Sequence, residues 1–192
     1  MKFKDHKNVS QYLVESLNCK LKFRHRWALV IGSVIPDITV YTYFRRSDGG
    51  QKLRGHNYEN SMDYMKRLVE SVNNDKANSI MKYIHIGMLL HYSADSFTYA
   101  HNSHFKGTIG EHREYEMRLH EELEEAMHNN ISGETLNEVN DIFARIMELH
   151  DMYVKEIPCC QIDCAYIFDI VTYIFNLLVG GDYAQHVQVN AA

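Results

Sequence analysis

Apolar residues recur at every third or fourth position along most of this chain, which is the spacing of one face of an α-helix. In the first segment these positions are Val9, Leu13, Leu17 and Leu21. The pattern predicts a helix from Asn8, a residue type that caps helices, to about Leu21. The next segment, Phe23 to Ile35, is apolar on nearly all sides, so we expect a central buried helix that ends at Pro36.

Five further segments show the same spacing and are separated by short polar breaks. The segment that follows His56 has its apolar face at Tyr58, Met62, Met65, Val69 and Val72. The other predicted helices cover about residues 77–100, 111–129, 136–153 and 162–180, and the last of them ends at a pair of glycines. Between Asp37 and His56 the chain has no helical pattern and contains two adjacent glycines, which is typical of an irregular loop beside a site. The sequence therefore predicts an all-α fold of about seven helices.

The composition agrees with a single helical domain that covers residues 1–192. The chain has 192 residues, enough for a substantial core, and contains only two prolines and 10 glycines. Its net charge is −5 and it has no basic cluster, so we expect no stable nucleic-acid partner. This charge does not exclude cleavage of nucleic acid.

The sequence indicates neither export nor a membrane span. The first residues, MKFKDHKNVSQYLVESL, are charged throughout and lack an apolar core of signal-peptide length, which favours a cytoplasmic location. The longest apolar run, Ala165 to Val179, is interrupted by Asp169 and Asn176 and is too short to cross a bilayer. We therefore expect this run to form a buried helix.

The stretch from His91 to Glu116 holds five residues that can bind a metal ion. His91 and Asp95 are four residues apart, as are His112 and Glu116, so each pair projects from one face of a helix. Between Asp95 and His101 a helix turns through roughly 240°, which favours a neighbouring ion for His101 over a shared one. Imidazole nitrogens and carboxylate oxygens, with no cysteine nearby, favour zinc over manganese or iron. The spacing therefore predicts two adjacent metal ions.

Similar candidate ligands occur earlier in the chain. In order, the segments that carry them are His6, the step Pro36–Asp37, His56, HYSADSFTYAH (91–101) and HREYE (112–116). In this order they resemble the ligand motifs of the zinc-dependent bacterial phospholipases C, over roughly residues 6 to 116. The resemblance implies an all-α fold around a multinuclear zinc cluster and a phosphoric diester hydrolase. We therefore expect a phospholipid substrate and transient contact with a membrane surface.

The resemblance also implies a role for each matching residue. One zinc ion would be held by Asp37, His56, His91 and Asp95, and a second by His101, His112 and Glu116. Asp95 would also bridge to a third zinc ion, shared with His6; two ions are expected and the third stays open. In the secreted family members the amino group and carbonyl of a processed N-terminal residue complete the third site, whereas this chain begins with Met1.

The expected reaction is phospholipase C-type cleavage of a phospholipid headgroup, because zinc lowers the pKa of bound water to about 7. The resemblance gives Asp37 the role of general base. In the phosphatidylcholine enzymes an aromatic residue follows this aspartate and contacts the choline, whereas here the position is Ile38. Candidate replacements are Tyr41, Tyr43 and Phe44. The nearby Arg45, Arg46 and Arg54 would instead attract an anionic group, so the headgroup stays open.

Several alternatives remain open. Zinc-dependent single-strand nucleases resemble the same pattern, but their last ligand is usually aspartate where this chain has Glu116, and a soluble phosphodiesterase is equally compatible. An HD-type phosphohydrolase needs an adjacent His–Asp pair, which His150 and Asp151 supply downstream of every other candidate. A non-catalytic module stabilised by zinc would need a site closed by four ligands, whereas the second predicted site has three. His120, one turn beyond Glu116, is a substitute ligand candidate.

Overall fold

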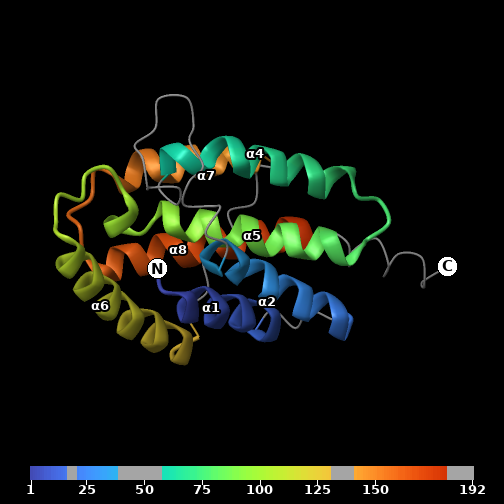
Figure 1. The fold of residues 1–192 in the computed structure, drawn as a ribbon, viewed down its shortest axis with the longest axis horizontal. Helices are drawn as coiled ribbons and strands as arrows, with labels where there is room; N and C mark the ends of the chain where they lie inside the picture. Colours follow the sequence, from blue (N-terminus) through green and yellow to red (C-terminus); the bar gives the residue numbers. More distant parts are fainter. Residues whose placement is uncertain (17–20, 39–57, 131–140, 181–192) are drawn as a thin grey trace.

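The computed structural model describes residues 1–16, 21–38, 58–130 and 141–180, and these ranges contain only helices and connecting turns. The helices are α1 (Phe3–Ser16), α2 (Phe23–Ile38), α4 (Tyr58–Asn74), α5 (Ile80–Ser96), the 3₁₀ turn η1 (Tyr99–His101), α6 (Ile109–His128), α7 (Ile142–Tyr153), α8 (Cys160–Phe175) and the π-helical turn η2 (Asn176–Gly180). In Figure 1, α5 and α8 lie between α4 and α7 on one side and α1 and α2 on the other, and α6 crosses one end. The predicted all-α fold of about seven helices is confirmed.

Two predicted helix boundaries are wrong. The first helix begins at Phe3 and not at Asn8, because Asp5 in its first turn accepts a hydrogen bond of 3.0 Å from the backbone amide of Lys2. Pro36 lies inside α2 and does not end it. A proline removes one backbone hydrogen bond, and near the end of a helix that loss interrupts little of the remaining helix. Asp37 is consequently fixed in the last turn of α2.

The helices α2 and α5 cross at two glycines. A Cβ atom on Gly32 would lie 2.2 Å from the carbonyl oxygen of Ile84, and one on Gly87 would lie 2.1 Å from that of Leu29. Only glycine permits this approach of two backbones. Both helices run in the same direction, since His25 stacks on Tyr83 before the crossing and the later parts of both helices meet beyond it. Their carboxyl ends, which carry the candidate ligands, therefore lie together.

The helix α8 forms the centre of the core, as predicted for the apolar run near residues 165–179. It packs against α5, α6 and α7. Together with η2 it spans Cys160–Gly180, 21 residues, which by length and composition alone would suffice to cross a membrane, so the prediction that this run is too short was wrong. In this fold 67% of its most apolar stretch is buried, which is the burial expected of a core helix.

Candidate metal centre

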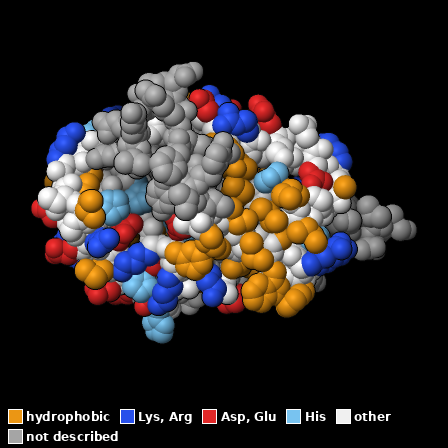
Figure 2. Space-filling view, viewed as in Figure 1, with side chains coloured by type: hydrophobic (Ala, Val, Ile, Leu, Met, Phe, Trp, Pro, Cys, Tyr) orange, Lys and Arg blue, Asp and Glu red, His pale blue; other side chains and the backbone are white. Residues whose placement is uncertain are grey.

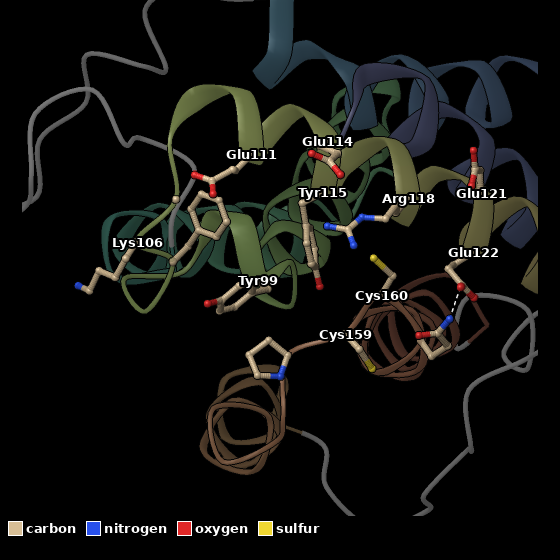
Figure 3. Close-up of a pocket in the computed structure, with 14 residues that line it drawn as sticks. Tyr99, Lys106, Glu111, Glu114, Tyr115, Arg118, Glu121, Glu122, Cys159 and Cys160 are labelled. Carbon is tan, nitrogen blue, oxygen red and sulfur yellow. Dashed lines mark hydrogen bonds between the residues drawn. The ribbon is translucent and has the colours of Figure 1, made fainter.

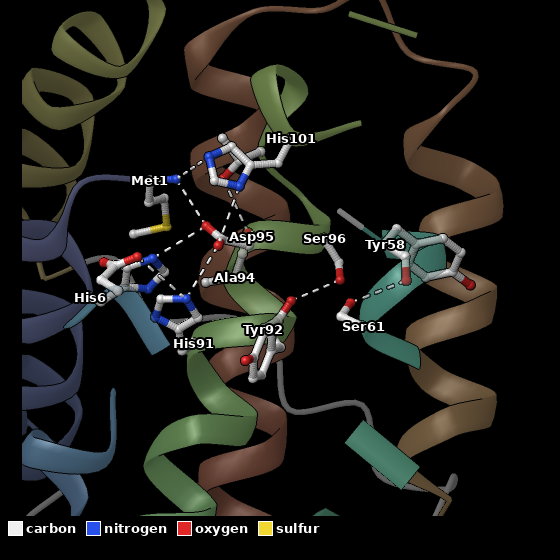
Figure 4. Close-up of polar contacts among 12 residues, drawn as sticks. Met1, His6, Tyr58, Ser61, His91, Tyr92, Ala94, Asp95, Ser96 and His101 are labelled. Carbon is white, nitrogen blue, oxygen red and sulfur yellow. Dashed lines mark hydrogen bonds and ion pairs between the residues drawn. The ribbon is translucent and has the colours of Figure 1, made fainter. Parts of the chain in front are cut away.

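Candidate ligands from five elements converge at the carboxyl ends of α2 and α5. His6 comes from α1, Asp37 from α2, His91 and Asp95 from α5, His101 from η1, and His112 and Glu116 from α6. Two groups of three have ligand atoms within 4.8 Å of one another and can each hold a metal ion: His6, His91 and Asp95, and His101, His112 and Glu116. Figure 4 shows His6, His91, Asp95 and His101 pointing toward one another. Of the predicted site residues, His56, Tyr41, Tyr43 and Phe44 lie outside the described residues.

The ring of His91 is oriented by a backbone carbonyl. Its Nδ1 lies 2.9 Å from the carbonyl oxygen of Ser33, and since a carbonyl only accepts, Nδ1 carries the proton. The lone pair is then on Nε2, which lies 3.4 Å from Asp95 Oδ2 and 3.9 Å from Asp37 Oδ1. A hydrogen bond to the second ring nitrogen is the usual support of a metal-binding histidine.

His6 is buried and held as a neutral imidazole. Its ring stacks on that of His91 with the centroids 3.8 Å apart. Burial, together with the neighbouring His91, lowers the pKa of His6 to about 3. Its Nε2 lies 3.2 Å from Asp95 Oδ1 but makes no hydrogen bond within the described part of the chain. A buried nitrogen in this position is suited to bind a metal ion, because a coordinating histidine must be neutral.

The second group is more open to solvent. Glu116 Oε1 lies 3.2 Å from Nε2 of His101 and 3.3 Å from Nε2 of His112. Burial acts to raise the pKa of Glu116, but the hydrogen bonds from both histidines outweigh it and lower the pKa. The side chain of His112 is 34% exposed, so this end of the cluster is accessible to a ligand from outside.

Asp95 connects the two groups. Its Oδ2 lies 3.3 Å from Nδ1 of His101, while its Oδ1 faces His6 and accepts a hydrogen bond of 2.9 Å from the amino group of Met1. The Met1 nitrogen also lies 3.0 Å from His101 Nε2 and 3.4 Å from Glu116 Oε1. Burial alone would raise the pKa of Asp95, but the positive charges of its neighbours outweigh burial and hold it well below the ordinary value.

The alternative histidines lie elsewhere. His120 Nδ1 contacts Asp5 Oδ1 at 2.6 Å and belongs to neither ligand group. His150, of the adjacent His–Asp pair, stacks on Tyr58 and contacts Asn102 Oδ1 at 2.9 Å. Its role is thus to pack and hydrogen-bond in the core, and the structure gives no support to an HD-type site at this pair.

Two buried polar side chains, Asn102 and Asp163, hold the segments that carry the candidate ligands. The sequence analysis did not predict either role. Asn102 directly follows His101 and donates to the carbonyl oxygens of Ser96 and Thr98 at 3.1 Å and 3.0 Å, which holds the chain between α5 and α6. Asp163 on α8 accepts hydrogen bonds from the amide of Tyr99 and from the hydroxyls of Tyr115 and Tyr153. Its position as an acidic residue in a mostly apolar helix was the one sequence signal that could have predicted a buried, hydrogen-bonded role for Asp163.

A separate groove of about 930 Å³ lies between α6 and the start of α8. Figure 3 shows its lining, which includes Lys106, Arg118 and Cys160. None of the candidate metal ligands lines it. Because ligand chemistry and not hollow volume identifies a metal centre, we place the candidate site at the histidine cluster.

Comparison with known proteins identifies the family of the chain. The family model of zinc dependent phospholipase C matches residues 5–160, which extends beyond the predicted motifs through α7 to the first residue of α8. We found no significant match among curated proteins or among solved structures. The family match covers most of the chain, including every candidate ligand. The chain therefore belongs to the zinc-dependent phospholipase C family.

Proposed function

We propose that this protein hydrolyses the phosphodiester bond between the glycerol and the headgroup of a phospholipid, with zinc bound at the candidate metal centre. The observation that carries the proposal is the position of Asp95, one carboxylate that contacts ligand atoms of both three-residue groups. Such a bridge would hold two ions as neighbours, as hydrolysis of a diester by a metal pair requires. Membership of the family supports the same reaction.

The residues fit zinc. The donor set is imidazole nitrogen and carboxylate oxygen, His91 is oriented with its lone pair on Nε2, and His6 is neutral and buried. Zinc in these sites supplies positive charge for the phosphate and a bound water that ionises near neutral pH. We propose that His6, His91 and Asp95, which the structure brings together, hold one ion and that His101, His112 and Glu116 hold another, with Asp37 and His56 as further ligands. In this assignment His6 shares the ion of His91, whereas the resemblance gave it a separate third ion, which stays open.

Asp37 is the proposed general base. Its side chain is 15% exposed, whereas those of His91 and Asp95 are buried, and this partial exposure supports a role for Asp37 toward water and substrate. In the hydrolysis a proton leaves the attacking water for Asp37 as its oxygen bonds to phosphorus. The bond between phosphorus and the glycerol oxygen breaks, and the glycerol oxygen takes a proton from solvent water. A carboxylate within reach of the attacking water can serve in this role.

The experiment is a comparison of two histidines on the same helix. We expect His112→Ala to abolish hydrolysis of both a chromogenic phosphocholine ester and a bis-aryl phosphate. His128→Ala, an exposed change in the last turn of α6, should leave both rates near those of the wild type. The zinc content per chain is measured beside the rates. Equal activity of the two variants, or a chain without zinc, would overturn the proposal.

The ratio of the two rates tests the substrate class. A higher rate on the phosphocholine ester supports the phospholipid headgroup. A higher rate on the bis-aryl phosphate, together with cleavage of single-stranded DNA, would favour the nuclease alternative. The candidate headgroup contacts Tyr41, Tyr43 and Phe44 stay predictions from the sequence.

A further inference from the structure

The outer face of α2 carries a line of exposed apolar side chains, which we call the α2 stripe. It consists of Phe23, Trp27, Ile31 and Ile38, whose exposed fractions are 76%, 50%, 48% and 63%. The first three are four residues apart and therefore lie on one face of the helix. Figure 2 shows hydrophobic side chains gathered over the part of the surface where Figure 1 places α2 and α5. A contiguous exposed apolar surface of this kind commonly marks an interaction site.

Positive charges accompany the stripe. Lys22, Arg24 and Arg26 surround its first turn, and Asp37 is the only carboxylate in α2. From the positions along a helix, Arg24 and Arg26 flank the stripe on opposite sides. The chain as a whole has a net charge of −5, so this local excess of positive charge runs against its average.

The stripe leads to the candidate metal centre. Ile38, its last member, is adjacent to Asp37, and the helix from Phe23 to Ile38 is about 22 Å long at 1.5 Å per residue. A flat surface in contact with the stripe would therefore also lie beside Asp37. Trp27 at the middle of the stripe has the side chain most favoured at membrane–water interfaces, with its ring edge-on to Phe23 at a centroid distance of 5.9 Å.

We propose that the α2 stripe rests on the surface of a phospholipid bilayer that contains anionic lipid, a proposal that rests on the proposed function. The apolar side chains enter the boundary between headgroups and acyl chains, and Arg24 and Arg26 lie among the phosphates. A second copy of the chain is the less suitable occupant, because its own α2 face carries the same excess of basic residues and offers little complementary negative charge.

The sequence contains a direct reporter, because Trp27 is the single tryptophan of the 192 residues. The zinc-loaded wild-type protein is mixed with vesicles of equal parts phosphatidylcholine and phosphatidylglycerol, and emission is recorded in the first seconds, before product accumulates. We expect a blue shift of the emission and quenching by lipids with brominated acyl chains. No shift, or a shift that bromolipids do not quench and that depends on protein concentration, would overturn the proposal, the latter in favour of a dimer.

Matched variants locate the contact. Phe23→Ser with Ile31→Ser keeps the reporter and should weaken vesicle binding on the order of tenfold or more, since two apolar side chains no longer leave water. Met147→Ser with Met152→Ser on α7, where exposures are 52% and 50%, should not change binding. An equal loss of vesicle binding in the α2 pair and the α7 pair would contradict a specific contact through the α2 stripe.

Hydrolysis of the soluble bis-aryl phosphate separates this proposal from the proposed function. The α2 variant pair should cut it at the wild-type rate. A protein that cuts the soluble diester but shows no change in Trp27 emission would refute the bilayer contact alone. A protein that binds vesicles through Trp27 but cuts no diester would refute the proposed function alone.

Discussion

The carboxylate of Asp163 on α8 accepts a hydrogen bond of 2.8 Å from the backbone amide of Tyr99, the first residue of η1. The same carboxylate accepts a bond of 3.0 Å from the hydroxyl of Tyr115 on α6. Tyr99 lies two residues before His101, and Tyr115 is adjacent to Glu116. One buried side chain in the core thus fixes two segments of the candidate metal centre.

Replacement of Asp163 should weaken both the fold and the site. We expect Asp163→Ala to lower the free energy of unfolding by about 2–4 kcal/mol, because it leaves buried donors without an acceptor. Asp163→Asn keeps one acceptor and should cost less. Urea unfolding and zinc content per chain are the measurements, with the exposed Asp151→Ala on α7 as control. An unfolding free energy for Asp163→Ala equal to that of the control would contradict this account.

Asp95 and Glu116 should differ in their effect on metal content. Asp95 contacts ligands of both groups, whereas Glu116 contacts the histidines of one. Asp95→Asn should therefore reduce zinc at both positions, and Glu116→Gln mainly at one, with activity lowered on the order of 10²-fold or more in each. Plasma emission spectrometry of the purified variants measures this difference. Identical zinc stoichiometry in the two variants would refute the bridging role of Asp95.

His150 should make the fold sensitive to mild acid. Burial lowers its pKa from 6.5 to about 4. Below pH 6.5 the unfolded chain binds a proton that the folded chain does not, so stability is complete above this pH and falls as the pH decreases toward 4. His150→Gln keeps an N–H donor for Asn102 and does not titrate. As the pH falls from 6.5 toward 4, the unfolding free energy of the wild type should therefore decrease relative to that of the variant. Curves of unfolding free energy against pH that stay parallel for the two proteins would contradict the lowered pKa of His150.

The close contact of α2 and α5 at Gly32 and Gly87 predicts opposite effects on stability for two glycine-to-alanine substitutions. Gly87→Ala places a Cβ atom 2.1 Å from a backbone oxygen and should cost about 1–3 kcal/mol or more, because neither helix can yield without moving its ligands. Gly110→Ala at the start of α6 meets its nearest atom at 3.7 Å and should be neutral or stabilise by up to about 1 kcal/mol. Thermal unfolding of the two variants is the measurement, and a stable Gly87→Ala protein would show that the crossing is looser than described.

The parts of this structure that local spacing determines could be predicted from the sequence. The pairs His91–Asp95 and His112–Glu116 are each held by one helix, so a spacing of four residues was enough to predict their geometry. The helix pattern itself follows from apolar periodicity. The resemblance of short motifs added His6 and Asp37, which come from other helices.

The remaining features depend on contacts between distant segments, and no local pattern encodes them. Asp5 and His6 are buried polar residues in α1, and their polarity concealed the true start of the helix. The acceptor for His91 is the backbone of Ser33, which any residue could offer. Asp163 acts through partners in three other elements, so its role becomes visible only once the helices are packed.

The direct contact of two backbones at Gly32 and Gly87 has a thermodynamic consequence. Asp37 and His91 are placed by the crossing itself, so the free energy of bringing these two groups together is contributed when the chain folds. If zinc binds there as proposed, its affinity and the folding stability are linked quantities, and the bound ion would stabilise the native state by an amount that grows with the logarithm of that affinity. Selection for tighter metal binding at this pair would act on the packing of two helices as much as on the ligands.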